Sequence, residues 1–243
     1  MKNNEIIQTI NISDGIVSGK NIPTYANIWQ MIAVNPDGKV VQRGTWNDDV
    51  SFFIRNGKEI LRRVQHVQYT DKLVIQKEEV FRDNLMHVWL TIHDEGKEPH
   101  TDIKYEGNRI WGKKVFRVDA LDSIEQISLP FSYELPHSIF DWHLWGILVS
   151  GFPLKECYTA RFLAHESYSY LPGDFRWFAI KVTGQEVIEC GKWGKVDCWL
   201  VQVIAEVEWK IWIAKQKDVA PVQQICIYNT DGVQFWWKPM MKF

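Results

Sequence analysis

Two imidazoles and a carboxylate lie within seven residues near the middle of the sequence, at His137, Asp141 and His143. These side chains are ligands of first-row metals and are also the usual groups of acid–base catalysis. On a helix, His137 and Asp141 share one face, but His143 lies about 200° around the axis from Asp141. Because two ligands do not make a metal site, we predict no metal here. Asp141 and His143 are the candidate catalytic residues, since histidine ordinarily changes charge near neutral pH.

No other residues form a recognisable catalytic arrangement. The remaining histidines stand singly, and the sequence contains no G-x-S-x-G, H-E-x-x-H, P-loop or G-x-G-x-x-G motif. We therefore expect no cofactor.

Tryptophan is unusually frequent, with 13 in 243 residues. Each buries a large apolar area and brings one N–H group that needs a partner when buried. Trp142 and Trp145 lie on one face of a helix, whereas Trp209 and Trp212 lie on opposite faces of a strand, so only one of them can face a cavity. Either these side chains fill a large core, or they line a cavity for an apolar ligand. In the second case the candidate ligand-binding residues are Trp142, Trp145, Trp209 and Trp212.

The elements that would position these residues are mainly strands. Turn signals recur along the chain, and the strongest is Asn56-Gly57, between the alternating runs 50–55 and 58–64. Similar β-branched and aromatic runs continue to residue 228, which predicts about ten or eleven antiparallel strands. A sheet of that size tends to curl or close. We predict an all-β, lipocalin-like fold, with a large antiparallel sheet curled into a barrel or half-barrel and one or two short plug helices.

Two stretches interrupt the strand period. Residues 119–124 fit either one helical turn or a loop, and residues 136–148 favour a short helix with Pro136 near its start and Ser138 as its cap. We expect one domain over residues 1–243, with a β half at 20–118, a plug region at 119–150 and a β half at 151–238. The aromatic stretch 235–243 is expected either to close the barrel or to contact a second subunit in a homo-oligomer.

Charge and cysteine usage limit the function classes. The 28 Lys and Arg are balanced by 30 Asp and Glu, so the chain lacks the basic footprint of a nucleic-acid-binding protein. No apolar run reaches the roughly 20 residues of a membrane-spanning helix, and residues 1–8 do not resemble a signal peptide. We therefore predict a cytoplasmic location and four free thiols, at Cys157, Cys190, Cys198 and Cys226.

Three short motifs stand out in the second half of the chain. Residues 182–186 read V-T-G-Q-E, residues 194–201 read G-K-V-D-C-W-L-V, and residues 212–215 read W-I-A-K. They resemble the V-x-G-x-E, G-x-(F/V)-(D/E)-C-(W/Y)-x-V and W-(I/V)-x-K strands of a broad bacterial family of unknown function. The resemblance covers roughly residues 120–230.

The resemblance implies a long antiparallel sheet like that of periplasmic lipoprotein carriers. Such a sheet would form an incomplete barrel, with short helices plugging its open side over an apolar cavity. The chain departs from the family pattern in two ways. Residues 1–8 do not resemble the export signal that most members carry, so we expect none, and residues 190–194 replace the usual small turn that contains proline. The first departure argues against a role in lipoprotein traffic.

An aromatic cavity is compatible with two function classes. The first is a non-catalytic binder or carrier of a hydrophobic small molecule. The second is a cofactor-free cyclase or isomerase of a polyene or polyketide, in which the cavity folds the substrate and Asp141 or His143 moves a proton. The sequence does not decide between them, and in both the expected partner is a hydrophobic small molecule rather than a nucleic acid.

Overall fold

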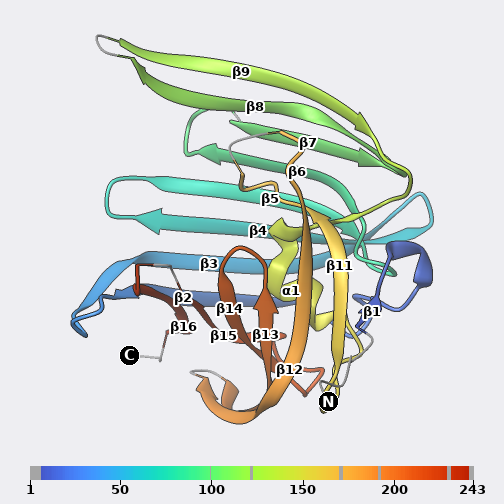
Figure 1. Ribbon diagram of the computed structural model, residues 1–243, viewed down its shortest axis with the longest axis vertical. Helices are drawn as coiled ribbons and strands as arrows, with labels where there is room; N and C mark the ends of the chain where they lie inside the picture. The colour runs from blue at the N-terminus through green and yellow to red at the C-terminus, as the bar shows by residue number, and fades with distance from the viewer. Residues whose placement is uncertain are drawn as a thin grey trace, which may run out of the picture.

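The computed structural model describes residues 7–98, 100–120, 123–169, 172–190, 193–228 and 231–240. Its main feature is a single sheet of sixteen strands with one short α-helix, α1, beside it (Figure 1). Neighbouring strands are antiparallel, except that β1 and β10 each pair in parallel with β11. The prediction of a mostly β, largely antiparallel fold is therefore confirmed.

The strands before the helix are β1 (Gln8–Thr9), β2 (Tyr25–Val34), β3 (Val40–Arg55), β4 (Lys58–Tyr69), β5 (Leu73–Phe81), β6 (His87–Asp94), β7 (Thr101–Glu106), β8 (Arg109–Ala120), β9 (Ser123–Glu134) and β10 (Phe140–Asp141). The strands after it are β11 (Thr159–His165), β12 (Phe175–Cys190), β13 (Gly194–Ile204), β14 (Glu208–Ala214), β15 (Val222–Tyr228) and β16 (Gln234–Pro239). The helical segments are η1 (Ile12–Asp14), η2 (Trp142–Leu144) and α1 (Trp145–Ser150).

The order of the strands shows that the sheet is open. It runs β1-β11-β12-β13-β14-β15-β16-β2-β3-β4-β5-β6-β7-β8-β9, so β1 and β9 are its two ends. The predicted barrel is therefore wrong, and the sheet is not strongly curled either. Among the described residues no ladder joins β9 to β1 or to β11: in β9 the side chains of residues 127–130 are exposed, and Phe131 and Tyr133 contact His165 and Phe175 only through their rings.

The structure has more strands than the sequence predicted. Residues 119–124 were expected to form a helical turn or a loop, yet β8 continues to Ala120 and β9 begins at Ser123, while residues 121–122 lie outside the described part of the chain. The two strands pair over their whole length, from Arg109 opposite Glu134 to Ala120 opposite Ser123. Such a long hairpin ladder overrides a weak local signal.

The C-terminal aromatic stretch forms part of the sheet. Its residues 235–239 lie in β16, which is paired with β15 on one side and with β2 on the other. Within β2–β9 and within β11–β16 each strand pairs with the next one along the chain, so the β16–β2 ladder is the seam between the two halves of the sheet. Residues 241–243 of this stretch lie outside the described residues.

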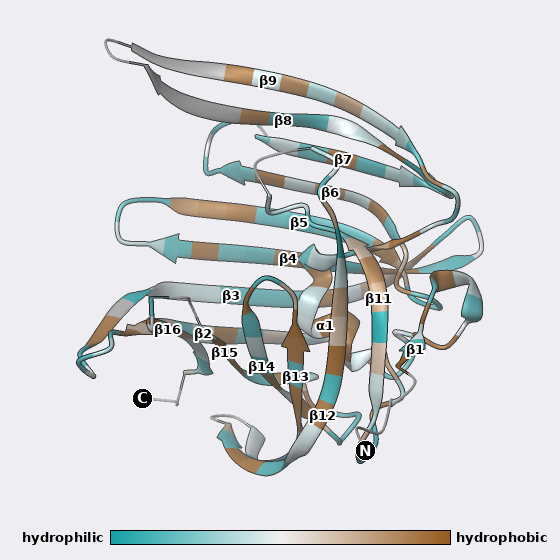
Figure 2. Ribbon diagram, viewed as in Figure 1, coloured by the Kyte–Doolittle hydropathy of each residue, from teal (hydrophilic) through white to brown (hydrophobic). Residues whose placement is uncertain are grey.

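The main hydrophobic core surrounds the segment from β10 to α1. Hydrophobic and hydrophilic residues alternate along many of the long strands (Figure 2), and the buried face of these strands contributes to this core. Trp142 stacks on Phe178 of β12 with ring centres 4.4 Å apart, and Trp145 packs against Trp46 of β3 at 5.1 Å. Strands from both halves of the sheet therefore contact the same short segment.

A second, smaller core contains three of the four cysteines. Cys190, Cys198 and Cys226 are buried together there, Cys157 is exposed, and all four are free thiols in the structure. In the described residues, no helix has the length and apolar character needed to span a membrane.

Close strand packing at Gly112 gives a test of the β7–β8 register. Gly112 lies opposite Ile103, and a Cβ added to it would lie 2.0 Å from the carbonyl oxygen of Asp102. We expect Gly112→Ala to lower the free energy of unfolding by about 1–3 kcal/mol in urea denaturation, because the backbone has to move. Gly184→Ala in β12 is the matched control, since its Cβ would meet no atom within 4 Å. Equal losses in the two variants would contradict the register.

Candidate functional site

The helical segment at the centre of the molecule begins later than the sequence predicted. Pro136 and Ser138 precede it, because Phe140 and Asp141 form β10 and pair with Ala164 and His165 of β11. Asp141, rather than Ser138, is the N-cap of η2, and its Oδ1 accepts a hydrogen bond of 2.7 Å from the backbone N–H of His143. The pairing with β11 holds residues 140–141 extended, so the expected start of the helix at 136 is wrong.

The Asp141 carboxylate is enclosed by hydrogen-bonding groups. Ser167 Oγ donates to Oδ1 at 2.7 Å, the hydroxyl of Tyr105 donates to Oδ2, and Nδ1 of His165 lies 2.9 Å from Oδ2. Burial alone would raise the pKa of Asp141, but the hydrogen bonds and charge of His165, with further help from Tyr105, hold it well below its usual range. The carboxylate is ionised, and its bonds fix the entry to the helix.

A second buried carboxylate, Glu78 of β5, holds His143. Its Oε2 lies 3.0 Å from Nδ1 of His143 and 2.8 Å from Nε2 of His87. Burial would raise the pKa of Glu78, but the charge and hydrogen bond of His143, followed by those of His87, hold it well below its usual range. His143 is fully buried and also stacks on the ring of Tyr168, with ring centres 4.7 Å apart.

Arg63 of β4 links Glu78 to a third carboxylate. Arg63 is opposite Glu78 in the β4–β5 ladder, with Nη1 3.4 Å from Oε1, and it binds Asp48 of β3 through Nε at 2.7 Å and Nη2 at 3.1 Å. All three side chains are buried. We call Asp48, Arg63, Glu78, His87 and His143 the buried ion network.

The predicted chemical residues are therefore only partly brought together. Asp141 and His143 are adjacent and buried, whereas His137 is exposed and not joined to them by a helix face. In the described residues no group of three or more His, Cys, Asp and Glu side chains is arranged to hold a metal ion.

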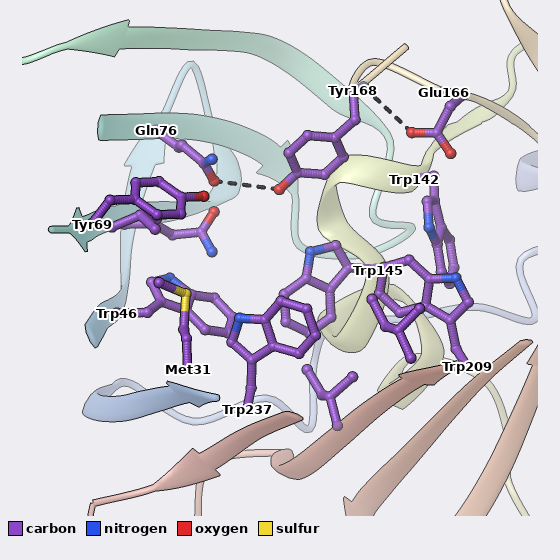
Figure 3. Close-up of a pocket in the computed structure, with 14 residues that line it drawn as sticks. Met31, Trp46, Tyr69, Gln76, Trp142, Trp145, Glu166, Tyr168, Trp209 and Trp237 are labelled. Carbon is purple, nitrogen blue, oxygen red and sulfur yellow. Dashed lines mark hydrogen bonds between the residues drawn. The ribbon is translucent and has the colours of Figure 1, made fainter. Parts of the chain in front are cut away.

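An apolar pocket lies beside the helical segment, and we call it the tryptophan pocket (Figure 3). Its volume is about 290 Å³. Its walls come from β2 to β5, from the helical segment, from the residues that follow β11, and from β14 to β16 across the seam. They include Met31 and the five tryptophans Trp46, Trp142, Trp145, Trp209 and Trp237.

Three of the four predicted ligand-binding tryptophans meet in this pocket. The ring of Trp209 lies 5.5 Å from that of Trp142 and 6.3 Å from that of Trp145. Trp212 points to the other face of β14, where it belongs to the cysteine-containing core and donates a 2.7 Å hydrogen bond to Glu186. His143, the other candidate on the helical segment, does not contribute to the lining.

Several lining residues were not predicted from the sequence. Trp46 and Trp237 lie on strands far from the helix in sequence, and the ladder pairings of β16 with β15 and β2 bring Trp237 opposite Ile225 and Met31. The alternation of apolar and polar residues could place both tryptophans on strands. Which face of each strand packs against the helical segment depends on how distant strands pair, including the β16–β2 pair at the seam.

The polar residues of the tryptophan pocket lie mainly on one side. Tyr168 donates a hydrogen bond from its hydroxyl to Oε1 of Gln76 at 3.4 Å and one from its backbone N–H to Glu166 at 3.3 Å (Figure 3). Burial, together with the nearby charge of Asp141, raises the pKa of Glu166 to about 7. Glu166 is thus a carboxyl group in the pocket wall that changes charge near neutral pH.

The buried ion network makes a strong prediction for stability. We expect Glu78→Gln to lower the free energy of unfolding by about 3–5 kcal/mol, because it leaves Arg63 and two imidazoles without their shared acceptor charge. Glu59→Gln is the matched control, since Glu59 is exposed and pairs with Arg82 at 3.3 Å, an arrangement worth at most about 1 kcal/mol. Chemical denaturation at pH 7 measures both, and a loss for Glu78→Gln as small as that of the control would refute the prediction.

Comparison with known proteins assigns the chain to a family. No curated protein and no solved structure matches the chain. Residues 90–224, more than half of the sequence, match the family model described as "Protein of unknown function (DUF3108)". The likeness of the sheet to that of periplasmic lipoprotein carriers stays a prediction, whereas the expected membership of a family of unknown function is confirmed over these residues. The chain belongs to the DUF3108 family of proteins of unknown function.

Proposed function

We propose that the protein binds a hydrophobic small molecule in the tryptophan pocket. The observation that carries this proposal is the convergence of five tryptophan rings and Met31 on one cavity from both halves of the sheet. Sites for apolar ligands are concave, mostly apolar and usually of about 300–1,000 Å³, and this pocket is at the lower end of that range.

The rings are held in place before a ligand arrives, which favours binding. Trp46 packs on Trp29 at 5.6 Å and on Trp145 at 5.1 Å, and Trp145 lies over the guanidinium of Arg63 at 4.9 Å. Rigid aromatic walls lose little conformational entropy on binding, so more of the contact energy contributes to affinity. Trp237 is only half-buried and reaches into the pocket from β16 (Figure 3).

Truncation of Trp237 tests the proposal with little damage to the core. We expect the neutral dye Nile red to fluoresce on binding the wild-type protein, and Trp237→Ala to raise its Kd about tenfold because an aromatic wall is lost. Trp177→Ala is the matched control, since Trp177 is 53% exposed on β12 and does not line the pocket. No binding to the wild type, or equal effects of the two variants, would contradict the proposal.

A second candidate function, proton-transfer catalysis on an apolar substrate, is favoured by Glu166. A general base is most effective when its pKa is near the working pH, and the Glu166 pKa of about 7 in the pocket wall meets this condition. Asp141 and His143 are committed to buried carboxylate–imidazole contacts. A cofactor-free isomerase or cyclase would therefore use Glu166 as its base.

The apolar probe 5-nitrobenzisoxazole tests this second function. A base removes the C3 proton while the N–O bond breaks, which gives coloured 2-cyano-4-nitrophenolate. We expect turnover to rise with pH and to level off above about 7, as the carboxylate forms, and Glu166→Gln to reduce it by roughly 10²-fold. Glu156→Gln, an exposed glutamate outside the pocket, should have no effect. If wild-type turnover equals the buffer rate, Glu166 is not a general base and only the binding function stands.

A further inference from the structure

A second cavity adjoins the tryptophan pocket. Its volume is about 1010 Å³, and three residues, Tyr69, Gln76 and Tyr168, line both cavities. The hydrogen bond between Tyr168 and Gln76, which Figure 3 shows, therefore joins two residues that line both cavities. A ligand longer than the tryptophan pocket would extend past these residues into the second cavity.

The second cavity differs from the first in carrying a surplus of positive charge. Lys72, Lys97, Lys113 and Lys114 contribute to its walls, against the two carboxylates Asp94 and Glu98. Lys97 is already paired with Asp94 at 2.9 Å. The other lysines remain as the main source of positive potential along the walls.

Lys114 is the unusual member of this set because it is buried. Only 2% of the residue is exposed, and its Nζ donates a 2.6 Å hydrogen bond to the backbone carbonyl of Ser169. An ammonium group has three N–H donors, and among the described residues no carboxylate lies within 4.0 Å of this one. A buried charge is ordinarily paired, since its desolvation is otherwise uncompensated.

The charge of Lys114 is compensated only weakly by the protein itself. Burial lowers the pKa of Lys114, and the more distant charges of Asp141, Glu166 and Asp174 offset this effect only in part. An anion bound against Nζ would supply the missing charge and accept the remaining hydrogen bonds. Bonds between an ammonium and a carboxylate or phosphate are among the stronger ones in proteins.

We propose that the ligand is an amphipathic anion, with its apolar body in the tryptophan pocket and a carboxylate or phosphate head group bound by Lys114 in the second cavity. This inference rests on the proposed binding function and adds the chemical class of the ligand to it. Tyr168 and Gln76 would lie beside the junction of the ligand's head group and apolar body. Each of these side chains has apolar atoms that can contact the body and a polar group that can contact the head group.

Displacement of Nile red by three twelve-carbon probes tests the inference. Dodecanoate, dodecyl phosphate and dodecanol share one chain and differ in the head group, and each is used below its micelle-forming concentration. We expect at least one anion to displace the dye at a concentration about tenfold lower than dodecanol does. The more effective of the two anions identifies the preferred head group.

Substitution of Lys114 then assigns the effect to one side chain. Lys114→Met keeps the length of the side chain and removes its charge, so we expect it to abolish the tenfold advantage of the anion while leaving displacement by dodecanol within about twofold of wild type. Lys104→Met is the matched control, because Lys104 is exposed on the neighbouring strand β7 and lies outside the second cavity. Lys72→Met, at the exposed edge of the cavity, is a second test that does not depend on the folding of Lys114→Met. We expect it to raise the anion concentration needed to displace the dye about threefold, and an unchanged concentration in every folded lysine variant of the cavity would overturn the inference.

The outcomes separate this inference from the proposed function. If Nile red binds and dodecanol displaces it as well as the anions do, the inference is overturned and the binding function stands. Displacement by neither anion also overturns the inference. If Nile red does not bind the wild-type protein at all, both proposals fail.

Discussion

The charge of Arg63 is the constraint on which the centre of the molecule depends. A guanidinium that is 0% exposed has to meet negative charge inside the protein, and Asp48 and Glu78 on the flanking strands provide it. Glu78 in turn binds His143, and Arg63 reaches the backbone carbonyl of His143 at 3.5 Å. The contacts of this one cation therefore connect β3, β4 and β5 to the start of the helical segment. A shift of the helical segment away from these strands would leave buried charges unpaired.

Two walls of the tryptophan pocket pack directly against this ion network. The guanidinium of Arg63 lies under the rings of Trp46 and Trp145, at 5.5 and 4.9 Å, so two walls of the pocket rest on the same charge. The buried carboxylates and imidazoles thus position aromatic rings, whereas Glu166 and Lys114 face the cavities. Residue type alone did not distinguish these roles, because histidine and aspartate serve equally well as catalysts and as buried supports.

Much of the fold, and less of the site, could be predicted from the sequence. Alternation along single strands is local, so it placed Trp209 and Trp212 on opposite faces and predicted hairpins such as the one at Asn56-Gly57. Whether the sheet closes and which faces meet depend on pairing between distant segments, which is why the barrel was wrong and Trp237 was missed. The helix start was misjudged because the β10–β11 pairing, 24 residues apart in sequence, outweighed the local preference at Ser138.

The seam between β16 and β2 has a consequence for how the protein is made. Met31 and Trp237 lie opposite each other across this ladder and form part of the same pocket wall. About 200 residues separate them, so their contact carries a large loop-closure cost and belongs among the slow steps of folding. During synthesis, the ribosome releases β2 long before β16 exists. Until then the nascent chain carries an unpaired β2 edge and an incomplete pocket, so its apolar surface is open to chaperones rather than to a ligand.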